Sequence, residues 1–325
     1  MSKTKILFID TTHPILPEKL EKAGFICHHF NSKSIDELKL IIADYQVLII
    51  RSKFYLDKSL INAATSLKLI GRVGSGMENI DIGYAESKNI TCLNSPEGNR
   101  DAVAEHALGM LLSLTNNLNR ADRQVRQGQW KRETNRGISI QERTIGIIGF
   151  GNTGSAFAQR LQGFNCTILA YDKYKSGFGN KFVIEAGLEE IFSQSDVVSF
   201  HVPLNNETRY MLCEPFIASF KKDFLLINTS RGHVVNTSDL VVAMKSGKIN
   251  AAALDVLEYE AVSFEDLYVK EMPCDLKYLV KSERVLLSPH IAGWTHESNI
   301  MLSDVLATKI KNHWKKNYQK PNLQN

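Results

Sequence analysis

The sequence has few cysteines, and none of them stands in a pairing or metal-binding pattern. The five cysteines are far apart in the chain, and no two of them form a C-x-x-C motif. They are Cys27, Cys92, Cys166, Cys213 and Cys274. An odd number of scattered thiols argues against a disulfide framework and against a zinc cluster, and it suits a reducing compartment. We therefore expect a chain without a metal site.

Long apolar runs and a large charge excess are also absent. No apolar stretch approaches the ~20 residues of a membrane-spanning helix, and the apolar run that ends before Asp10 is too short for the core of a signal peptide. Basic residues exceed acidic residues by only 39 to 35, which argues against the dense basic face of a nucleic-acid-binding protein. We expect a cytoplasmic chain that binds neither membranes nor nucleic acids.

The 325 residues suffice for about two domains, and short apolar runs alternate with amphipathic stretches in two series. This alternation predicts parallel sheets covered by helices. The runs of the first series are 5–9, 25–30, 47–50, 67–73 and 90–93. Their number is typical of a five-stranded flavodoxin-like domain.

The second series follows a long helical pattern that extends from Asp101 to about Gly128. Its six runs are 144–150, 166–172, 197–203, 224–230, 251–256 and 284–291. Six strands are typical of a complete doubly wound nucleotide-binding domain. The chain is helical again from Thr295, and we expect this last helix to pack on the first series. The predicted fold class is α/β, with two doubly wound parallel-sheet domains.

A glycine-rich turn between a strand and a helix is the most specific local signal. Its glycines follow the G-x-G-x-x-G spacing of a dinucleotide-binding loop, and they are Gly149, Gly151 and Gly154. They allow a tight turn, close approach of a pyrophosphate to the helix, and close packing of the helix on the strand. Asp172 ends the next strand, where a carboxylate would bind ribose hydroxyls and repel a 2′-phosphate. We therefore predict NAD, although Lys173 and Lys175 leave NADP open.

Four polar residues follow strands of the second series, where ligands bind in open α/β sheets. Strands end at His201, Arg231 and His290, and the strand that runs into Asp255 leads on to Glu260. We interpret Arg231 as a fork for a substrate carboxylate, His290 as the proton donor to a carbonyl oxygen, and Glu260 as the partner of the far ring nitrogen.

Plainer interpretations of these residues remain open at this stage. Arg231 would also suit a surface loop, Glu260 a solvated polar run, and His290 a satisfied interior site. Glu258 lies two residues from Glu260 and is an alternative partner. His201 is an alternative proton donor, although its strand is expected to lie beside the cofactor.

Taken together, the chain resembles the D-isomer-specific 2-hydroxyacid dehydrogenases over essentially its full length. The segments that carry the resemblance include GRVGSGMENID, INTSRGHVV, AAALDVLEYE and SPHIAGWT, at 71–81, 227–235, 251–260 and 288–295. The family's catalytic arginine, glutamate and histidine fall on Arg231, Glu260 and His290. The resemblance implies a phosphoglycerate dehydrogenase-like or hydroxypyruvate reductase-like enzyme.

The resemblance also implies binding residues and a domain plan. Cofactor contacts, beyond the three glycines, would come from Asn152, Thr153, Asp172, His201, Val202, Thr229 and Asp255. A Rossmann NAD-binding domain, 101–291, would be inserted into a flavodoxin-like substrate-binding domain, 1–100 with 292–325. A helix and arm at about 101–140 would form a homodimer.

Substrate contacts implied by the resemblance lie in the first domain. The loop Gly74, Ser75 and Gly76 would offer backbone N–H groups to the substrate carboxylate opposite Arg231. Arg51, Lys53 and Arg72 could bind a distal phosphate, although Arg51 and Arg72 would also suit pairing with nearby acids. The first choice of substrate is therefore 3-phosphoglycerate with its oxo form 3-phosphohydroxypyruvate, in serine biosynthesis. The alternatives are glyoxylate or hydroxypyruvate reduction and erythronate 4-phosphate oxidation. From another class, an NAD(H)-binding regulatory module like the corepressors of this fold is the rival hypothesis.

Departures from the family pattern occur beside Glu260. Ala261 stands where a proline is usual, and the 29 residues between Glu260 and His290 exceed those of shorter members. The additional segment 265–278 could shape or cover the site. The length leaves no room for a C-terminal serine-sensing domain, so we do not expect feedback control by that route.

Overall fold

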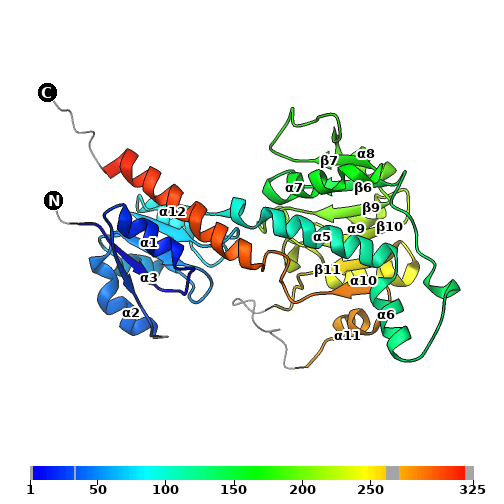
Figure 1. The fold of residues 1–325 in the computed structure, drawn as a ribbon, viewed down its shortest axis with the longest axis horizontal. Helices are drawn as coiled ribbons and strands as arrows, with labels where there is room; N and C mark the ends of the chain where they lie inside the picture. The colour runs from blue at the N-terminus through cyan, green and yellow to red at the C-terminus, as the bar shows by residue number, and fades with distance from the viewer. Residues whose placement is uncertain (1–2, 33, 261–270, 319–325) are drawn as a thin grey trace. The chain divides into compact units, whose positions relative to one another are not determined.

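A computed structural model describes residues 3–32, 34–260 and 271–318. The chain divides into two compact units (Figure 1), one formed by 1–99 with 294–325 and the other by 100–293. Each unit contains one parallel sheet. Ala261 and the part of the additional segment before residue 271 lie outside the described residues.

The sheet of the first unit has five parallel strands in the order β2-β1-β3-β4-β5. The strands are β1 (Lys5–Phe8), β2 (Ile26–His29), β3 (Val47–Ile50), β4 (Leu69–Arg72) and β5 (Thr91–Asn94). This is the flavodoxin-like order, with β1 and β3 at the switch point. The three central strands are almost fully buried because helices cover both faces.

Helices of the first unit form two layers. Those on one face are α2 (Ile35–Ile41), α3 (Lys58–Ala63) and α4 (Ile82–Ser87). Those on the other are α1 (Ile15–Lys22) and α12 (His296–Tyr318). Gly98 contacts α12 closely, since a Cβ there would lie 2.5 Å from the Leu302 nitrogen. The C-terminal helix is therefore an integral part of the unit that the N-terminal residues begin.

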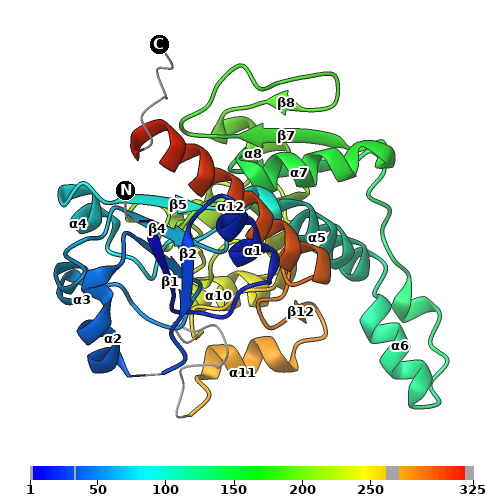
Figure 2. The same ribbon diagram turned by 60° about the vertical axis from the view of Figure 1, so that its left-hand side comes forward.

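The sheet of the second unit has seven parallel strands in the order β12-β11-β10-β9-β6-β7-β8. They are β6 (Thr144–Ile148), β7 (Thr167–Tyr171), β8 (Ile184–Glu185), β9 (Val197–Phe200), β10 (Phe224–Asn228), β11 (Ile249–Leu254) and β12 (Val285–Leu287). Figure 2 shows β7 and β8 at one edge and β12 at the other. The six longer strands match the predicted ones, and the prediction missed β8 because two exposed residues carry no periodicity. Both sheets confirm the predicted fold class.

Two apolar layers cover the second sheet. One contains residues of α5 (Arg100–Thr115) and α7 (Asn152–Leu161). The other contains residues of α8 (Leu188–Gln194), α9 (Glu214–Ala218), α10 (Thr237–Ser246) and α11 (Cys274–Lys281). Helices on both faces bury the strands, which explains why the strand sequences are continuous apolar runs rather than alternating ones.

The single long helix expected from Asp101 to Gly128 is wrong. The structure has α5 and then α6 (Leu118–Arg126), because Asn117 adopts a left-handed backbone with φ 53°. Asparagine tolerates this conformation better than most residues, so it ends one helix and turns the chain before the next.

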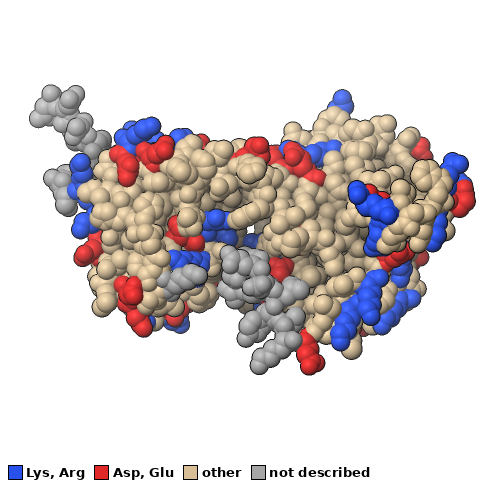
Figure 3. Space-filling model, turned by 60° about the horizontal axis from the view of Figure 1, so that its bottom comes forward, with Lys and Arg blue, Asp and Glu red and all other residues tan. Residues whose placement is uncertain are grey.

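The described helices and one face of the surface bear on the predictions about membranes and charge. Among the described residues, none of the helices combines the length and apolar character that crossing a membrane requires. On the face drawn in Figure 3, lysine and arginine side chains are interspersed with aspartate and glutamate. This mixture agrees with the small net charge of +4.

Candidate active site

The predicted glycine loop joins β6 to α7. Gly149 has φ +94°, and a Cβ there would lie 2.5 Å from the His201 carbonyl oxygen. A Cβ on Gly154 would lie 2.0 Å from the Gly149 oxygen, so the helix can approach the turn only with glycine. Gly151 differs, because no atom lies within 4 Å of its Cβ position at the start of α7. Open space before helical N–H groups fits a pyrophosphate.

Asp172 lies at the end of β7, beside this loop. Its Oδ2 accepts the Phe150 N–H at 2.8 Å, and its Oδ1 accepts the N–H groups of Tyr174 and Lys175 at 3.0 and 3.1 Å. These bonds hold the carboxylate at the mouth of the loop. A carboxylate has about four lone-pair sites, so it keeps acceptor capacity for a ribose hydroxyl.

The two lysines that left NADP open have other partners. Lys173 Nζ lies 2.6 Å from Glu207 Oε1, and Lys175 Nζ donates to the Phe150 carbonyl at 3.2 Å. Glu207 also accepts the Tyr174 hydroxyl, and these contacts lower the pKa of Glu207. Sequence reasoning missed Glu207, because its partner lies 34 positions away in the chain.

His201 and Thr229 follow the two strands next to β6 on its other side. Burial lowers the pKa of His201 to about 3, which favours a neutral ring near pH 7. Its Nε2 lies 2.8 Å from Ser199 Oγ. The Thr229 hydroxyl is buried without a hydrogen-bond partner among the described residues. Such an orphaned group fits a bound polar ligand.

The structure brings Glu260 and His290 together. Glu260 Oε2 lies 2.6 Å from His290 Nδ1, and its Oε1 accepts the Leu257 N–H. Both side chains are largely shielded, with 14% and 23% exposed. Glu258 has a different partner, because its Oε2 accepts the Thr237 N–H at the start of α10 at 3.0 Å. The geometry thus separates the two glutamates that the sequence left as alternatives.

Arg231 lies directly after β10, where its guanidinium Nη1 donates to the Ser230 carbonyl at 2.6 Å. The adjacent Gly232 packs against the segment that precedes Glu260, since a Cβ there would lie 2.0 Å from the Leu257 oxygen. The backbone that carries Arg231 and the backbone that carries Glu260 are therefore in contact. Asp255, 1% exposed, lies at the end of β11.

The predicted substrate residues of the first unit lie at the ends of β3 and β4. The Arg51 guanidinium carbon lies 4.8 Å from the centre of the Trp294 ring. The Arg72 guanidinium occupies the space that a Cβ on Gly74 would need. The Gly74 N–H donates to Ser95 Oγ at 3.2 Å. The role of the Gly74, Ser75 and Gly76 N–H groups toward a substrate stays a prediction.

A residue that the sequence analysis did not propose for the site, Asp10, holds the loop that follows β3 at residues 51–53. Asp10 Oδ2 accepts three consecutive N–H groups, those of Arg51, Ser52 and Lys53, at 2.8 to 3.0 Å. Lys53, which the sequence suggested for a phosphate, donates to the Ser32 carbonyl at 2.9 Å. Its Nζ also lies 5.2 Å from the centre of the Phe54 ring.

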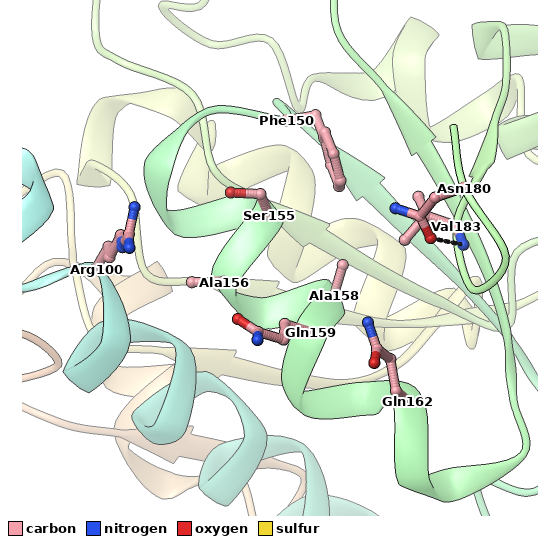
Figure 4. Close-up of a pocket in the computed structure, with 9 residues that line it drawn as sticks. All are labelled: Arg100, Phe150, Ser155, Ala156, Ala158, Gln159, Gln162, Asn180 and Val183. Carbon is pink, nitrogen blue, oxygen red and sulfur yellow. Dashed lines mark hydrogen bonds between the residues drawn. The ribbon is translucent and has the colours of Figure 1, made fainter. Parts of the chain in front are cut away.

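A pocket of about 300 Å³ lies along α7 (Figure 4). Its lining includes Phe150, Ser155, Gln159 and Asn180, and the predicted catalytic residues are not part of it. Within the part of the chain that the structure describes, no group of His, Cys, Asp and Glu side chains is arranged to hold a metal ion.

Comparison with known proteins shows the family of the chain. Residues 108–292 match the family model "D-isomer specific 2-hydroxyacid dehydrogenase, NAD binding domain". A hydroxypyruvate reductase of Thermotoga maritima is 34% identical over 277 residues, which are 85% of this chain and 87% of that protein. A D-3-phosphoglycerate dehydrogenase of Archaeoglobus fulgidus is 32% identical over 95% of this chain.

Solved structures show the same fold. The D-lactate dehydrogenase of Aquifex aeolicus, solved with NAD and lactic acid, superposes with a TM-score of 0.82 at 27% identity and covers 96% of both chains. The sheets and the glycine loop define a nucleotide-binding α/β protein. The chain belongs to the D-isomer-specific 2-hydroxyacid dehydrogenase family, and the predicted cofactor, NAD, is confirmed. It spans 57% of the length of the Archaeoglobus phosphoglycerate dehydrogenase.

Proposed function

We propose that the chain is an NAD-dependent dehydrogenase that interconverts a D-2-hydroxy acid and the matching 2-oxo acid. The observation that carries this proposal is the 2.6 Å contact between Glu260 and His290, in the unit that holds the glycine loop. A histidine paired with a shielded carboxylate can hold and release a proton at its other ring nitrogen. Family membership adds NAD as the cofactor.

Each side chain has a role in this proposal. Glu260 fixes the His290 ring with Nδ1 toward the carboxylate, which assigns to Nε2 the proton that the substrate oxygen receives or returns. Arg231 binds the substrate carboxylate as a planar fork. The nicotinamide, when bound, gives or accepts the hydride. The buried His201 ring and the unpartnered Thr229 hydroxyl are the residues that would line the cofactor side.

We place 3-phosphohydroxypyruvate and 3-phosphoglycerate first among substrates, with Arg51 and Arg72 as the phosphate ligands and serine biosynthesis as the role. The Archaeoglobus relative supports this choice. Hydroxypyruvate or glyoxylate is the second choice, favoured because the Thermotoga hydroxypyruvate reductase aligns over 87% of its length. Engagement of Lys53 with Ser32 also leaves fewer cations for a phosphate than the sequence suggested.

A panel of 2-oxo acids, with and without a phosphate, tests the function through NADH consumption. Erythronate 4-phosphate with NAD covers the remaining enzyme alternative. Turnover of one acid with kcat/KM of at least about 10⁴ M⁻¹s⁻¹ is expected. Tight NADH binding without turnover of any acid would instead favour the regulatory module, and absence of NADH binding would refute both hypotheses. Replacement of Arg72 by methionine should raise KM for the phosphorylated acid alone.

We also propose a homodimer through 101–140. Apolar side chains in this region are strongly exposed, with Trp130 at 80%, Leu118 at 54% and Val125 at 51%. Light scattering of the wild type and of a Trp130→Glu variant tests it, and a variant that stays dimeric would contradict the assignment of the arm. The cytoplasmic location stays a prediction, which cell fractionation can test.

A further inference from the structure

The turn that carries His290 is fastened to one buried residue. Asp255 accepts the Ile291 N–H on Oδ1 and the Ala292 N–H on Oδ2, both at 2.8 Å. Its carbonyl oxygen accepts the His290 N–H at 2.7 Å. His290 itself has φ +55°, a left-handed conformation that a residue with a side chain adopts only when its surroundings hold it there. Asp255 therefore fixes the position of the backbone from which the His290 side chain extends.

A second pair of side chains holds the Asp255 carboxylate. Ser288 Oγ donates to Asp255 Oδ1 at 2.6 Å, and His106 Nε2 lies 3.0 Å from Ser288 Oγ. An ionised carboxylate only accepts, so it takes the single proton of the serine. The serine oxygen must then accept from the histidine, which places a proton on His106 Nε2. The chain of donors runs from His106 through Ser288 to Asp255.

His106 reaches this chain from a rigid element. It lies on α5, a helix of 16 residues (Figure 1). This helix packs against β11 and β12. Its side chain is 25% exposed, and its Nε2 lies 3.6 Å from Asp255 Oδ1. A partly shielded imidazole thus supplies the donor, and when charged a counterion, for a carboxylate that is 1% exposed.

We propose that His106 is a positioning residue of the reaction, which acts through Ser288 and Asp255 to hold the His290 turn. The proposal rests on the proposed function, in which His290 exchanges the substrate proton. It assigns no contact between His106 and the substrate. A shift of a reacting group by about 1 Å can lower a rate about 100-fold, so loss of the anchor should act on kcat although His106 never reaches the substrate.

Paired variants separate this role from simple packing. Ser288→Ala and His106→Leu remove the donors and should lower kcat about 10- to 100-fold. Ser288→Thr keeps the hydroxyl, and His106→Gln keeps an N–H at a similar reach, so both should restore most of the turnover. His106→Asn stays polar but is too short to reach Ser288, and it serves if the leucine variant does not fold. His28→Leu, on the edge strand β2 of the other unit, is the matched control.

NADH affinity and one spectroscopic signal complete the test. The dissociation constant of NADH should stay within about threefold in all variants, because Asp255, itself a predicted cofactor contact, is unchanged and keeps its bonds to the Ile291 and Ala292 N–H groups. The His290 Nδ1–H resonance, assigned by its loss in Glu260→Gln, should shift in the Ala, Leu and Asn variants and return in the Thr and Gln variants.

Several outcomes would overturn the proposal. It fails if His106→Leu retains both kcat and the resonance, or if the conservative variants lose as much turnover as the disruptive ones. A wild-type protein without turnover would refute the proposed function instead, and the resonance would still decide whether His106 positions His290.

Discussion

Replacement of Glu260 by glutamine tests the central pair of the site. The carboxylate serves two donors at once, with Oε2 on His290 Nδ1 at 2.6 Å and Oε1 on the Leu257 N–H. Glutamine has one oxygen, so it can satisfy only one of them. If the oxygen stays with Leu257, the amide N–H₂ faces Nδ1 and favours the wrong tautomer. If it turns to His290, the Leu257 N–H loses its acceptor.

The size of the effect follows from the charge and the shielding of the pair. A hydrogen bond to a charged group contributes about 1.5 to 3 kcal/mol. Because about 1.4 kcal/mol corresponds to a tenfold change in rate, kcat should fall about 10- to 150-fold. NADH affinity should not change, since the glycine loop is intact. Steady-state kinetics with the best 2-oxo acid, together with NADH fluorescence titration, measures both quantities.

Glu258→Ala is the matched control, two residues away. It removes the acceptor of the Thr237 N–H at the start of α10. Loss of such a cap costs about 1 kcal/mol, which corresponds to a fall in Tm of about 2–4 °C for a domain of this size, while kcat should be retained. The reasoning is refuted if Glu260→Gln keeps its turnover or if Glu258→Ala loses it.

Other properties of the second unit can be tested in the same way. Gly151→Ala should leave Tm nearly unchanged but weaken NADH binding at least about tenfold. Gly154→Ala should weaken binding and also lower Tm, because its Cβ would lie 2.0 Å from the Gly149 oxygen. Calorimetry measures Tm and titration measures NADH binding, and normal NADH binding by both variants would contradict this expectation. Asp172→Ser should lower the preference for NADH over NADPH, measured as the ratio of the two dissociation constants, by about tenfold, because it removes a carboxylate that repels the 2′-phosphate. Glu207→Gln should lower the same ratio by about threefold, because it releases Lys173. An unchanged ratio would argue against these roles. The pKa of His201 is lowered from 6.5 to about 3, so between these pH values the unfolded chain binds a proton that the folded chain does not. The free energy of unfolding should therefore fall as the pH drops from 6.5 towards 3, by roughly 3 kcal/mol at about pH 4. Denaturant unfolding at several pH values should show a weaker loss of stability in acid for His201→Phe than for the wild type, and an equal loss would count against the buried neutral ring.

The sequence predicts much of this fold because parallel strands are buried on both faces and therefore read as apolar runs. Six strands of the second unit have this character, whereas Ile184–Glu185 is exposed and was missed. The break between α5 and α6 was also missed, because it depends on a left-handed asparagine within a continuous amphipathic pattern. Local backbone conformation of this kind leaves no periodic signal.

The candidate site divides along similar lines. Residues at strand ends, such as His290, were predictable because topology alone brings them to one edge of the sheet. Partners from distant segments were not, as Asp10 for the loop after β3 and Glu207 for Lys173 show. The choice between Glu258 and Glu260 likewise needed three dimensions, because the two carboxylates diverge toward different elements.

The way in which Asp10 holds residues 51 to 53 has a consequence for how this family could change substrate. All three bonds go to backbone N–H groups, so the shape of the loop does not depend on which side chains it carries. Exchange of Arg51 for a neutral or apolar residue should then alter the chemistry offered to a substrate without remodelling the loop. Single substitutions at position 51 could therefore change the preference between phosphorylated and unphosphorylated acids. A change of Asp10 would instead disturb the loop backbone, whichever residue stands at position 51.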